Sequence, residues 1–333
     1  MTTAGELSLY ALDPDQTFAI DVARRLGVSL SPLEDRVFED GEYKVRPLES
    51  VRGHDVYVLS SLYHGVDASS ADRLLKMLFF IGALRDAGAA RITAVTPYLC
   101  FARKDRRTKP RDPVTTRYVA QLFEAMRVDG LIGIDIHNLA AFQNAFRCET
   151  IHLDAQALFA QRLVADIGDT PVSVVSPDLG GDKRAELFRQ RLERLLGRAV
   201  GKGFMDKFRS EGRVTSDIFA GDVRDRIAIV IDDLIAGGGT MARVAAACRT
   251  HGALRVVGVA THGVFTAQGH ALLASSPLDR LLITDTAPIH TSSPISTILG
   301  DRLTVVSAAS LFGEAIRRRH MNLSITELLE NGP

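Results

Sequence analysis

Two neighbouring carboxylates, Asp232 and Asp233, stand between a short apolar run and a turn that is rich in glycine. The run, Ile227 to Ile231, has the β-branched composition of a buried parallel strand, and Met241 to Cys248 predicts a helix. The turn consists of Gly237, Gly238, Gly239 and Thr240. A strand, a glycine turn and a helix N-terminus together form a cradle for phosphate, because backbone N–H groups point inward and the helix dipole favours an anion.

Carboxylates at the lip of such a cradle repel phosphate, so they suit sugar hydroxyls or a metal that neutralises a pyrophosphate. Phosphate together with ribose hydroxyls is therefore the expected ligand. The alternative interpretation is an ordinary turn between a strand and a helix of a doubly wound sheet, where Asp and Gly are common.

A second segment packs six cationic side chains into nine positions. It follows a predicted strand, Ile92 to Val95, and Pro110 and Pro113 keep it a loop. The cations are Arg103, Lys104, Arg106, Arg107, Lys109 and Arg111, with Asp105 among them. Loops at the carboxyl ends of parallel strands bind ligands, and Arg binds phosphate oxygens at two points, so we expect a polyphosphate here. The alternative is a solvated, charged surface.

Two further strand ends carry candidate metal ligands. Asp135 and His137 flank one residue after a predicted strand, Leu131 to Ile134, so their side chains are expected to point the same way. A histidine near a carboxylate can bind a metal, but a hydrogen-bonded structural histidine explains the pattern equally well. Asp178 and two glycines follow another predicted strand, Val172 to Val175, and could form a second anion or metal site.

Composition and charge exclude several classes of protein. The chain has 333 residues, enough for two domains, and its 40 Lys and Arg residues balance 40 Asp and Glu residues, so no overall field recruits nucleic acid. Cys100, Cys148 and Cys248 lie far apart without a C-x-x-C pattern, which indicates neither a disulfide framework nor a zinc site. Neither a signal peptide nor an apolar stretch of about 18 residues is present, so no membrane span and a cytoplasmic location are expected.

Strands alternate with helices along the chain, which predicts an α/β fold of two similar, doubly wound domains with mostly parallel sheets. The first domain is expected to comprise residues 1–154, joined by the C-terminal helix region 309–333, and the second residues 155–308. The predicted helices are Thr17–Leu26, Ala71–Ala87, Thr115–Met126, Ala155–Asp166, Arg184–Leu196 and Ala309–His320. Further predicted strands are Leu7–Ala11, Val56–Leu59, Val256–Ala260, Leu281–Thr284 and Leu303–Val306.

In their order, and nearly from end to end, these motifs resemble those of the phosphoribosyl pyrophosphate synthetase family, the ribose-phosphate diphosphokinases. The similar stretches are Phe38–Glu42 to F-x-D-G-E, Phe101–Arg107 to Y-A-R-Q-D-R, Asp135–Asn138 to D-L-H, Ser176–Ala185 to S-P-D-x-G-G-x-x-R-A, Met205–Arg209 to D-K-R-R, and Thr284–Thr286 to T-D-T. The glycine turn resembles the ribose-phosphate loop that these synthetases share with phosphoribosyltransferases, which implies domains like those of type I phosphoribosyltransferases.

On the nucleotide side, the resemblance implies that the adenine of ATP is held by Phe38, Asp40 and Glu42. It also implies ATP binding by Arg103, Lys104 and Asp105. Lys104 stands where the family has an amide that contacts the nucleotide, and this departure bears on the choice of base and on affinity.

On the sugar side, the resemblance places Asp232 and Asp233 on the ribose hydroxyls. It places the turn residues Gly237, Gly238, Gly239 and Thr240 on the 5-phosphate. Gly237 replaces a hydroxyl residue, so one phosphate contact is lost. Ala236 stands where the synthetases often have an acid.

Metal ligands and catalytic groups are implied in the same way. His137 and Asp178 match the magnesium ligands of the family. Lys207 and Arg209 match a mobile catalytic lysine and arginine, in a loop rich in glycine, serine and charge.

The implied activity is transfer of the β,γ-diphosphoryl group of Mg-ATP to the 1-hydroxyl of ribose 5-phosphate, giving phosphoribosyl pyrophosphate and AMP. The implied cofactor is Mg²⁺, and the chain is expected to form a homo-oligomer, a dimer or a hexamer. One alternative is a non-catalytic member that binds nucleotide and regulates a partner, suggested by Ala236, Gly237 and Lys104. Another is a phosphoribosyltransferase, which explains the glycine turn but leaves Phe38–Glu42 and Phe101–Arg107 unexplained.

Overall fold

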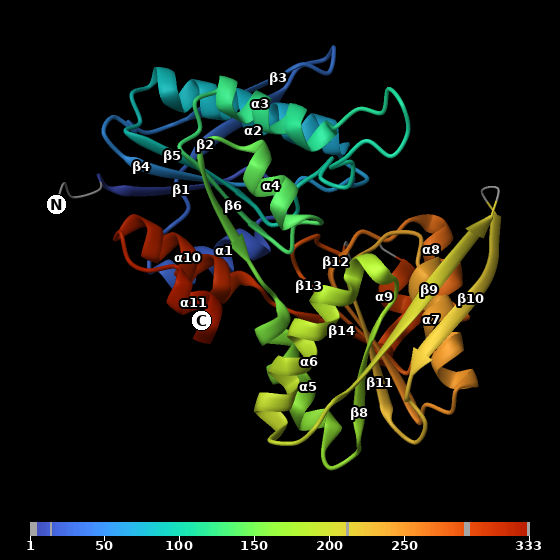
Figure 1. Cartoon of the computed structure of the whole chain (residues 1–333). Helices are drawn as coiled ribbons and strands as arrows, with labels where there is room; N and C mark the ends of the chain where they lie inside the picture. Colours follow the sequence, from blue (N-terminus) through green and yellow to red (C-terminus); the bar gives the residue numbers. More distant parts are fainter. Residues whose placement is uncertain (1–4, 14, 211–212, 290–293, 332–333) are drawn as a thin grey trace. The chain divides into compact units, whose positions relative to one another are not determined.

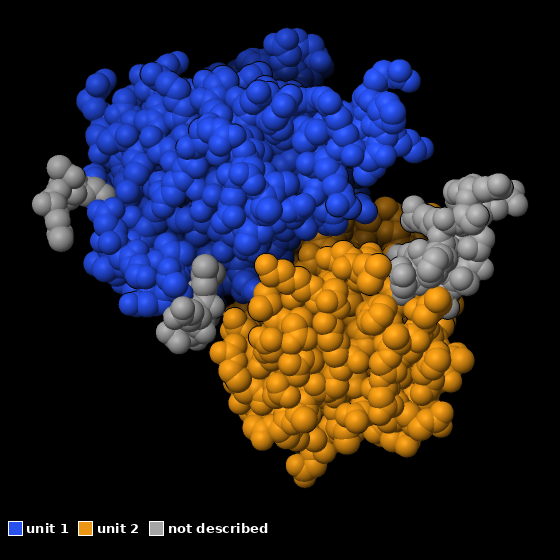
Figure 2. Space-filling model, viewed as in Figure 1, with its two compact units in different colours: residues 1–154, 307–333 blue, residues 155–306 orange. Residues whose placement is uncertain are grey.

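A computed structural model describes residues 5–13, 15–210, 213–289 and 294–331 of the chain, with the backbone alone at 206–210, 213–217 and 329–331. Helices and strands alternate along most of its length (Figure 1). The chain divides into two compact units (Figure 2): residues 1–154 with 307–333 form unit 1, and residues 155–306 form unit 2.

Unit 1 is built on a sheet of five parallel strands whose spatial order is their order along the chain. The strands are β1 (Leu7–Ala11), β4 (Asp55–Leu59), β5 (Arg91–Thr96), β6 (Gly130–Ile134) and β7 (Glu149–Leu153). β4 and β6 are buried at every position. Such burial on both faces explains why the central strands of a parallel sheet read as continuous apolar runs in the sequence.

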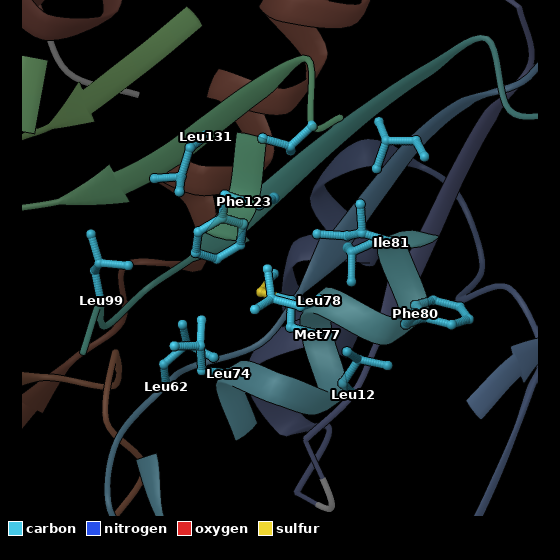
Figure 3. Close-up of a cluster of buried hydrophobic side chains, with 14 of the residues drawn as sticks. Leu12, Leu62, Leu74, Met77, Leu78, Phe80, Ile81, Leu99, Phe123 and Leu131 are labelled. Atoms are coloured by element: carbon cyan, nitrogen blue, oxygen red, sulfur yellow. The ribbon is translucent and has the colours of Figure 1, made fainter. Parts of the chain in front are cut away.

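Helices cover both faces of this sheet (Figure 1). They are α1 (Thr17–Leu26), α2 (Ser70–Asp86), α3 (Thr115–Ala125), α4 (Leu139–Ala145), α10 (Ala309–His320) and α11 (Thr326–Asn331). Buried side chains of α2, including Met77 and Ile81, pack with Phe123 of α3 and Leu131 of β6 (Figure 3). On α1 and α10, the rings of Phe18 and Phe312 meet edge to face at 5.6 Å.

A separate hairpin of β2 (Leu33–Val37) and β3 (Tyr43–Pro47) is attached to α2. The Lys76 ammonium on α2 lies 2.9 Å from the Asp35 carboxylate. The ring centroids of Tyr43 and Phe79 lie 6.0 Å apart. These contacts connect the hairpin to the helix layer of unit 1.

Unit 2 contains a seven-stranded sheet in the order β10-β9-β8-β11-β12-β13-β14, parallel throughout except for β10. The strands are β8 (Val172–Ser176), β9 (Gly201–Ser210), β10 (Arg213–Gly221), β11 (Ile227–Ile235), β12 (Arg255–Gly263), β13 (Arg280–Thr284) and β14 (Leu303–Val306). The chain leaves β8 for β9 on one side and returns to β11 on the other. The edge where β8 and β11 end is thus the topological switch point, where open α/β sheets bind ligands.

The helices of unit 2 are α5 (Gln156–Ile167), α6 (Asp182–Leu196), α7 (Gly239–Thr250), α8 (Ala267–Ala274) and α9 (Pro294–Leu299). Figure 1 shows α5 and α6 on one face of the sheet and α7 and α8 on the other. Val244 and Ala245 of α7 pack with Val230 of β11 and Val256 of β12 in one core cluster. Two mostly parallel sheets covered by helices confirm the predicted α/β fold.

Several predicted elements of unit 2 differ from the structure, and two of these differences concern segments that carry candidate site residues. The strand expected to end at Ile231 continues to Ile235, because β11 pairs with β12 as far as Gly263. The segment around Lys207, expected to be a loop, is an antiparallel hairpin of β9 and β10, and β9 also pairs with β8. Ladder hydrogen bonds to neighbouring strands stabilise these residues, although their own sequence has little strand character.

No helix in the parts of the chain that the structure describes is long and apolar enough to cross a membrane.

Candidate functional site

The acidic pair lies on β11 at the switch point of unit 2. Asp233 is buried, with 6% of its surface exposed, and Asp232 is partly buried. The Asp232 carboxylate accepts a hydrogen bond of 2.9 Å from the backbone N–H of Asp233. One guanidinium nitrogen of Arg184, on α6, lies 3.4 Å from Asp232 Oδ1 and 3.3 Å from Asp233 Oδ1. The two carboxylates therefore share one cation.

Electrostatics make this pair unusual. Burial raises the pKa of the Asp232 carboxyl, the charge of Asp233 raises it further, and Arg184 opposes the shift. Two negative charges in a poorly solvated place repel each other and favour any ligand that donates hydrogen bonds. Sugar hydroxyls are such donors.

The contact of Arg184 with the two aspartates was not predicted from the sequence, which indicated only that a helix begins at this residue. The usable signal was its position in the stretch from Ser176 to Ala185, close behind Asp178. Its contact with both aspartates depends on the packing of α6 beside β11, which spacing along the chain does not reveal.

The glycine turn leads from β11 into α7, as predicted. Gly238 is the N-cap of α7 and has a φ of 67°, in the left-handed region that glycine tolerates best. A Cβ at Gly238 would meet Leu273 Cγ at 3.0 Å, whereas a Cβ at Gly237 would meet nothing within 4 Å. The carbonyl of Ala236 accepts a hydrogen bond of 3.0 Å from the N–H of Thr266. Gly238 is thus required by the turn, while Gly237 leaves open space.

Asp178 follows β8, the neighbour of β11, and lies at the same edge of the sheet. Its carboxylate accepts a hydrogen bond of 3.0 Å from the N–H of Gly181 and so caps the short turn that leads into α6. Its carbonyl accepts a hydrogen bond of 2.6 Å from the Ser176 hydroxyl. Unit 2 therefore brings Asp178, the acidic pair and the glycine turn to one edge.

Side-chain hydrogen bonds connect the carboxyl ends of β12 and β13, the next two strands of the sheet. The Thr284 hydroxyl donates to the carbonyl of Thr261 at 2.6 Å, and Thr286 Oγ1 lies 2.9 Å from His262 Nδ1. All four residues are buried. Thr284 and Thr286, which match the family's T-D-T, thus stabilise the ends of β12 and β13.

In unit 1, the cationic loop follows β5 and the residues around His137 follow the neighbouring strand β6. The Asp105 carboxylate accepts a hydrogen bond of 2.5 Å from the side-chain amide of Asn138, whose oxygen caps α4. Two separately predicted motifs therefore lie side by side. Most cations of the loop are exposed, namely Arg103, Arg106, Arg107, Lys109 and Arg111. Lys104 instead lies 2.5 Å from the Asp112 carboxylate.

The expected shared direction of Asp135 and His137 is wrong. The strand β6 ends at Ile134, and Asp135 has a φ of 40°, so strand alternation stops before it. Asp135 is buried with 8% exposure, whereas His137 is exposed. His137 is therefore the residue that can reach a ligand.

Phe38, Asp40 and Glu42 lie in the turn of the β2–β3 hairpin, and all three are exposed. The Asp40 carboxylate accepts a hydrogen bond of 3.0 Å from the N–H of Glu42. The Phe38 ring centroid lies 4.9 Å from the Arg36 guanidinium carbon. An exposed aromatic face at a turn suits stacking with a base.

Lys207 and Arg209 fall on β9, opposite Asp217 and Val214 of β10. Their side chains lie outside the described residues.

Within the described parts of the chain, no group of three or more His, Cys, Asp or Glu side chains could hold a metal ion by itself. His137 belongs to unit 1 and Asp178 to unit 2. Mg²⁺ is commonly bound by one or two carboxylates together with water and substrate phosphates rather than by a complete protein cage. A single oxygen donor such as the Asp178 carboxylate fits an ion that arrives with a polyphosphate.

Comparisons with known proteins agree with these observations. Residues 7–126 match the model of the N-terminal domain of ribose phosphate pyrophosphokinase, and residues 216–330 match that of the phosphoribosyl synthetase-associated domain. A ribose-phosphate pyrophosphokinase of Caldanaerobacter subterraneus is 36% identical over 97% of both chains. One of Aquifex aeolicus is 32% identical over 97% of this chain and 98% of the relative.

Among solved structures, the phosphoribosylpyrophosphate synthetase of Mycobacterium smegmatis superimposes with a TM-score of 0.85 and 32% identity. The match covers 95% of this chain and 99% of that one. Two family models, full-length relatives and a shared fold lead to the same conclusion. The chain belongs to the ribose-phosphate pyrophosphokinase family.

Proposed function

We propose that this chain transfers the β,γ-diphosphoryl group of Mg-ATP to the 1-hydroxyl of ribose 5-phosphate, producing phosphoribosyl pyrophosphate and AMP. The observation that carries this proposal is the acidic pair of β11 beside a glycine turn at the switch point of unit 2. Carboxylates that accept hydrogen bonds from hydroxyls, next to a helix N-terminus that favours phosphate, suit a sugar phosphate.

Ribose 5-phosphate is assigned to unit 2. Asp232 and Asp233 accept hydrogen bonds from the ribose hydroxyls, and Arg184 keeps the two carboxylates close together. The 5-phosphate binds at the turn formed by Gly237, Gly238, Gly239 and Thr240, whose backbone donors and helix dipole favour an anion. The exposed position of Gly237 supports this assignment.

ATP is assigned to unit 1. Phe38, Asp40 and Glu42 hold the adenine, and Arg103 with its exposed cationic neighbours binds the triphosphate. Arg guanidinium groups match phosphate oxygens at two points, which supports a polyphosphate in this loop. Magnesium enters as part of the Mg-ATP substrate, and His137 and Asp178 are the residues proposed to contact it.

The chemical step is a displacement at phosphorus. The oxygen of the ribose 1-hydroxyl forms a bond to the β-phosphorus, the bond from that phosphorus to the α–β bridging oxygen breaks, and AMP leaves. The hydroxyl proton passes to solvent. Lys207 and Arg209 are proposed to stabilise the charge that develops on the transferred group.

The decisive experiment combines purified protein with ATP, Mg²⁺ and ribose 5-phosphate and measures AMP. Formation of AMP that requires ribose 5-phosphate supports the proposal. Nucleotide binding without AMP formation would indicate a non-catalytic member of the family. Pyrophosphate release from phosphoribosyl pyrophosphate and a base would indicate a phosphoribosyltransferase.

Two properties are proposed alongside this activity. The proposed substrates are metabolites of the cytoplasm, so we place the chain there. It is also proposed to form a homo-oligomer, a dimer or a hexamer, which light scattering in solution tests directly.

A further inference from the structure

The loop between β5 and α3 has an organising centre, the carboxylate of Asp112. Its Oδ2 atom accepts hydrogen bonds from Lys104 Nζ at 2.5 Å and from Thr108 Oγ1 at 2.8 Å. The same atom accepts from the N–H of Thr108 at 3.0 Å and of Lys109 at 2.9 Å. Lys104 Nζ also donates to Thr108 Oγ1 at 2.9 Å. These four hydrogen bonds to one oxygen connect both ends and the middle of the segment 104–112.

Charge explains why this loop needs such a centre. Five exposed cations belong to the same loop, and like charges repel one another and favour an open loop. Lys104 differs from them, since its side chain is 33% exposed and is paired with Asp112, which is 22% exposed. The Lys104 ammonium is also the main cause that holds the pKa of Asp112 well below its usual range.

The backbone at both ends of the loop adopts a conformation that is costly for residues other than glycine. Phe101 has a φ of 56° and Arg111 a φ of 68°, both in the left-handed region. Such conformations persist where surrounding contacts hold them. The Thr115 hydroxyl donates to the carbonyl of Phe101 at 2.9 Å, and Asp112 adjoins Arg111. The shape of the loop thus depends on side-chain contacts at each end.

We propose that Lys104 is a positioning residue: paired with Asp112, it clamps the loop in the shape that presents the exposed cations to the triphosphate, and it does not contact the nucleotide itself. The proposal rests on the assignment of ATP to this loop. It also accounts for a lysine where the family has an amide, because the Lys104 ammonium forms an ion pair with Asp112 in the same loop.

Hydrogen–deuterium exchange of the protein without substrates tests the clamp directly. The variants are Lys104→Gln and Asp112→Asn, with Lys109→Gln as the matched control. The control removes one positive charge from the same loop but leaves every side-chain contact of Asp112 in place. The clamp predicts that the Thr108 amide exchanges at least about threefold faster in Lys104→Gln and Asp112→Asn, and at the wild-type rate in Lys109→Gln. Unchanged exchange in Lys104→Gln overturns the proposal.

Steady-state kinetics separate positioning from direct contact. If Lys104 acts through Asp112, the two single variants raise KM for ATP by similar factors, about threefold, and the double variant raises it no further. If Lys104 contacts the nucleotide, Lys104→Gln raises KM for ATP while Asp112→Asn, which frees the ammonium, lowers it; that result overturns the proposal. The exchange measurement uses no substrate, so a failure of the wild type to form AMP would count against the proposed function and not against the clamp.

Discussion

The candidate phosphate-binding groups of the two units differ in kind: backbone groups in unit 2 and charged side chains in unit 1. Unit 2 uses backbone donors in a turn between a buried strand and a helix, with Gly238 in a conformation that other residues adopt at a cost. Unit 1 uses exposed cationic side chains on a loop that follows β5. A backbone cradle is rigid and specific for one phosphate, whereas a set of long side chains can accommodate a flexible triphosphate. The difference teaches that similar α/β frames can present phosphate-binding groups by opposite means, and the proposed division of substrates between the units makes this contrast testable.

The largest effect is expected at a residue that belongs to neither binding region. Lys207→Ala should lower kcat by about 10²-fold or more, as for the loss of a preorganised charge donor, with little change in ATP binding. Single-turnover and steady-state assays of AMP formation measure this effect. A variant with near-normal kcat would remove Lys207 from the chemistry and leave the two binding regions to account for catalysis.

Lys202→Ala is the matched control for Lys207, because both lysines lie on β9. The Lys202 ammonium lies 2.9 Å from the Asp182 carboxylate and 3.5 Å from that of Glu186. Its loss should change the melting temperature slightly and kcat little.

The next effect concerns the acidic pair in unit 2. Asp232→Asn and Asp233→Asn keep the shape of the side chain but weaken hydrogen bonds to hydroxyls, each worth about 1.5–3 kcal/mol. KM for ribose 5-phosphate should therefore rise about tenfold or more, while KM for ATP changes little. If the constant for ATP moves instead, the division of substrates between the units is wrong.

A gain of affinity is expected at Gly237. Gly237→Thr should lower KM for ribose 5-phosphate, because a hydroxyl on phosphate adds on the order of 1–2 kcal/mol. The structure favours this change, since a Cβ at Gly237 meets nothing within 4 Å and its φ is not positive. An unchanged KM in a stable variant would mean that the 5-phosphate does not lie against residue 237.

Gly238→Thr is the matched control for that gain. Gly238 has a φ of 67°, and a Cβ there would meet Leu273 Cγ at 3.0 Å. The melting temperature should fall in this variant and stay near wild type in Gly237→Thr.

A smaller effect comes from salt. Exposed charges are screened over a Debye length of about 8–10 Å at physiological ionic strength, so KM for ATP should rise several-fold between about 0.05 and 0.5 M KCl. KM for ribose 5-phosphate should rise less, because backbone donors in a turn carry no full charge. Kinetics at fixed free Mg²⁺ measure both constants, and equal slopes would abolish the contrast between the units.

The smallest effect is a pH-dependent change in stability. The folded-state pKa of Asp232 lies above the ordinary value of about 4, so the folded protein loses stability as pH rises from about 4 through the raised pKa. Asn carries no such proton. Asp232→Asn should therefore melt about 2–4 °C above wild type at pH 8, and the difference should shrink towards pH 5. A difference that is independent of pH would refute the raised pKa of Asp232, which burial and the charge of Asp233 cause.

Much of the fold could be predicted from local signals. Helix α1 spans Thr17–Leu26 as predicted, and Gly27 ends it with a φ of 71°, because a left-handed cap strongly favours glycine. Helix α10 likewise matches its predicted span, Ala309–His320. Amphipathic periodicity and capping residues act within a few residues of each other, so these boundaries are visible in the sequence.

Elements that depend on distant partners were missed or shortened. The β9–β10 hairpin forms where the sequence is rich in glycine and charge, and the last residues of β11 are strand because β12 lies beside them. Helix α4 (Leu139–Ala145) is too short for a clear helical period. The edge strand β7 (Glu149–Leu153) contains Glu149, Thr150 and His152 and so lacks the apolar run of the central strands.

The sequence by itself determined which residues follow each parallel strand, and therefore which motifs lie at the carboxyl ends of the strands. Asp178 follows β8 and the acidic pair lies on β11, and the adjacency of these two strands in the folded sheet brings them to one switch point. Only the tertiary structure decided which side chains turn towards each other: Arg184 towards Asp232 and Asp233, and Lys104 towards Asp112. The position of each strand along the chain is encoded by local patterns of hydrophobicity and turns. The order of the strands in a sheet and the pairing of side chains depend instead on the packing of whole elements, which spacing along the chain does not specify.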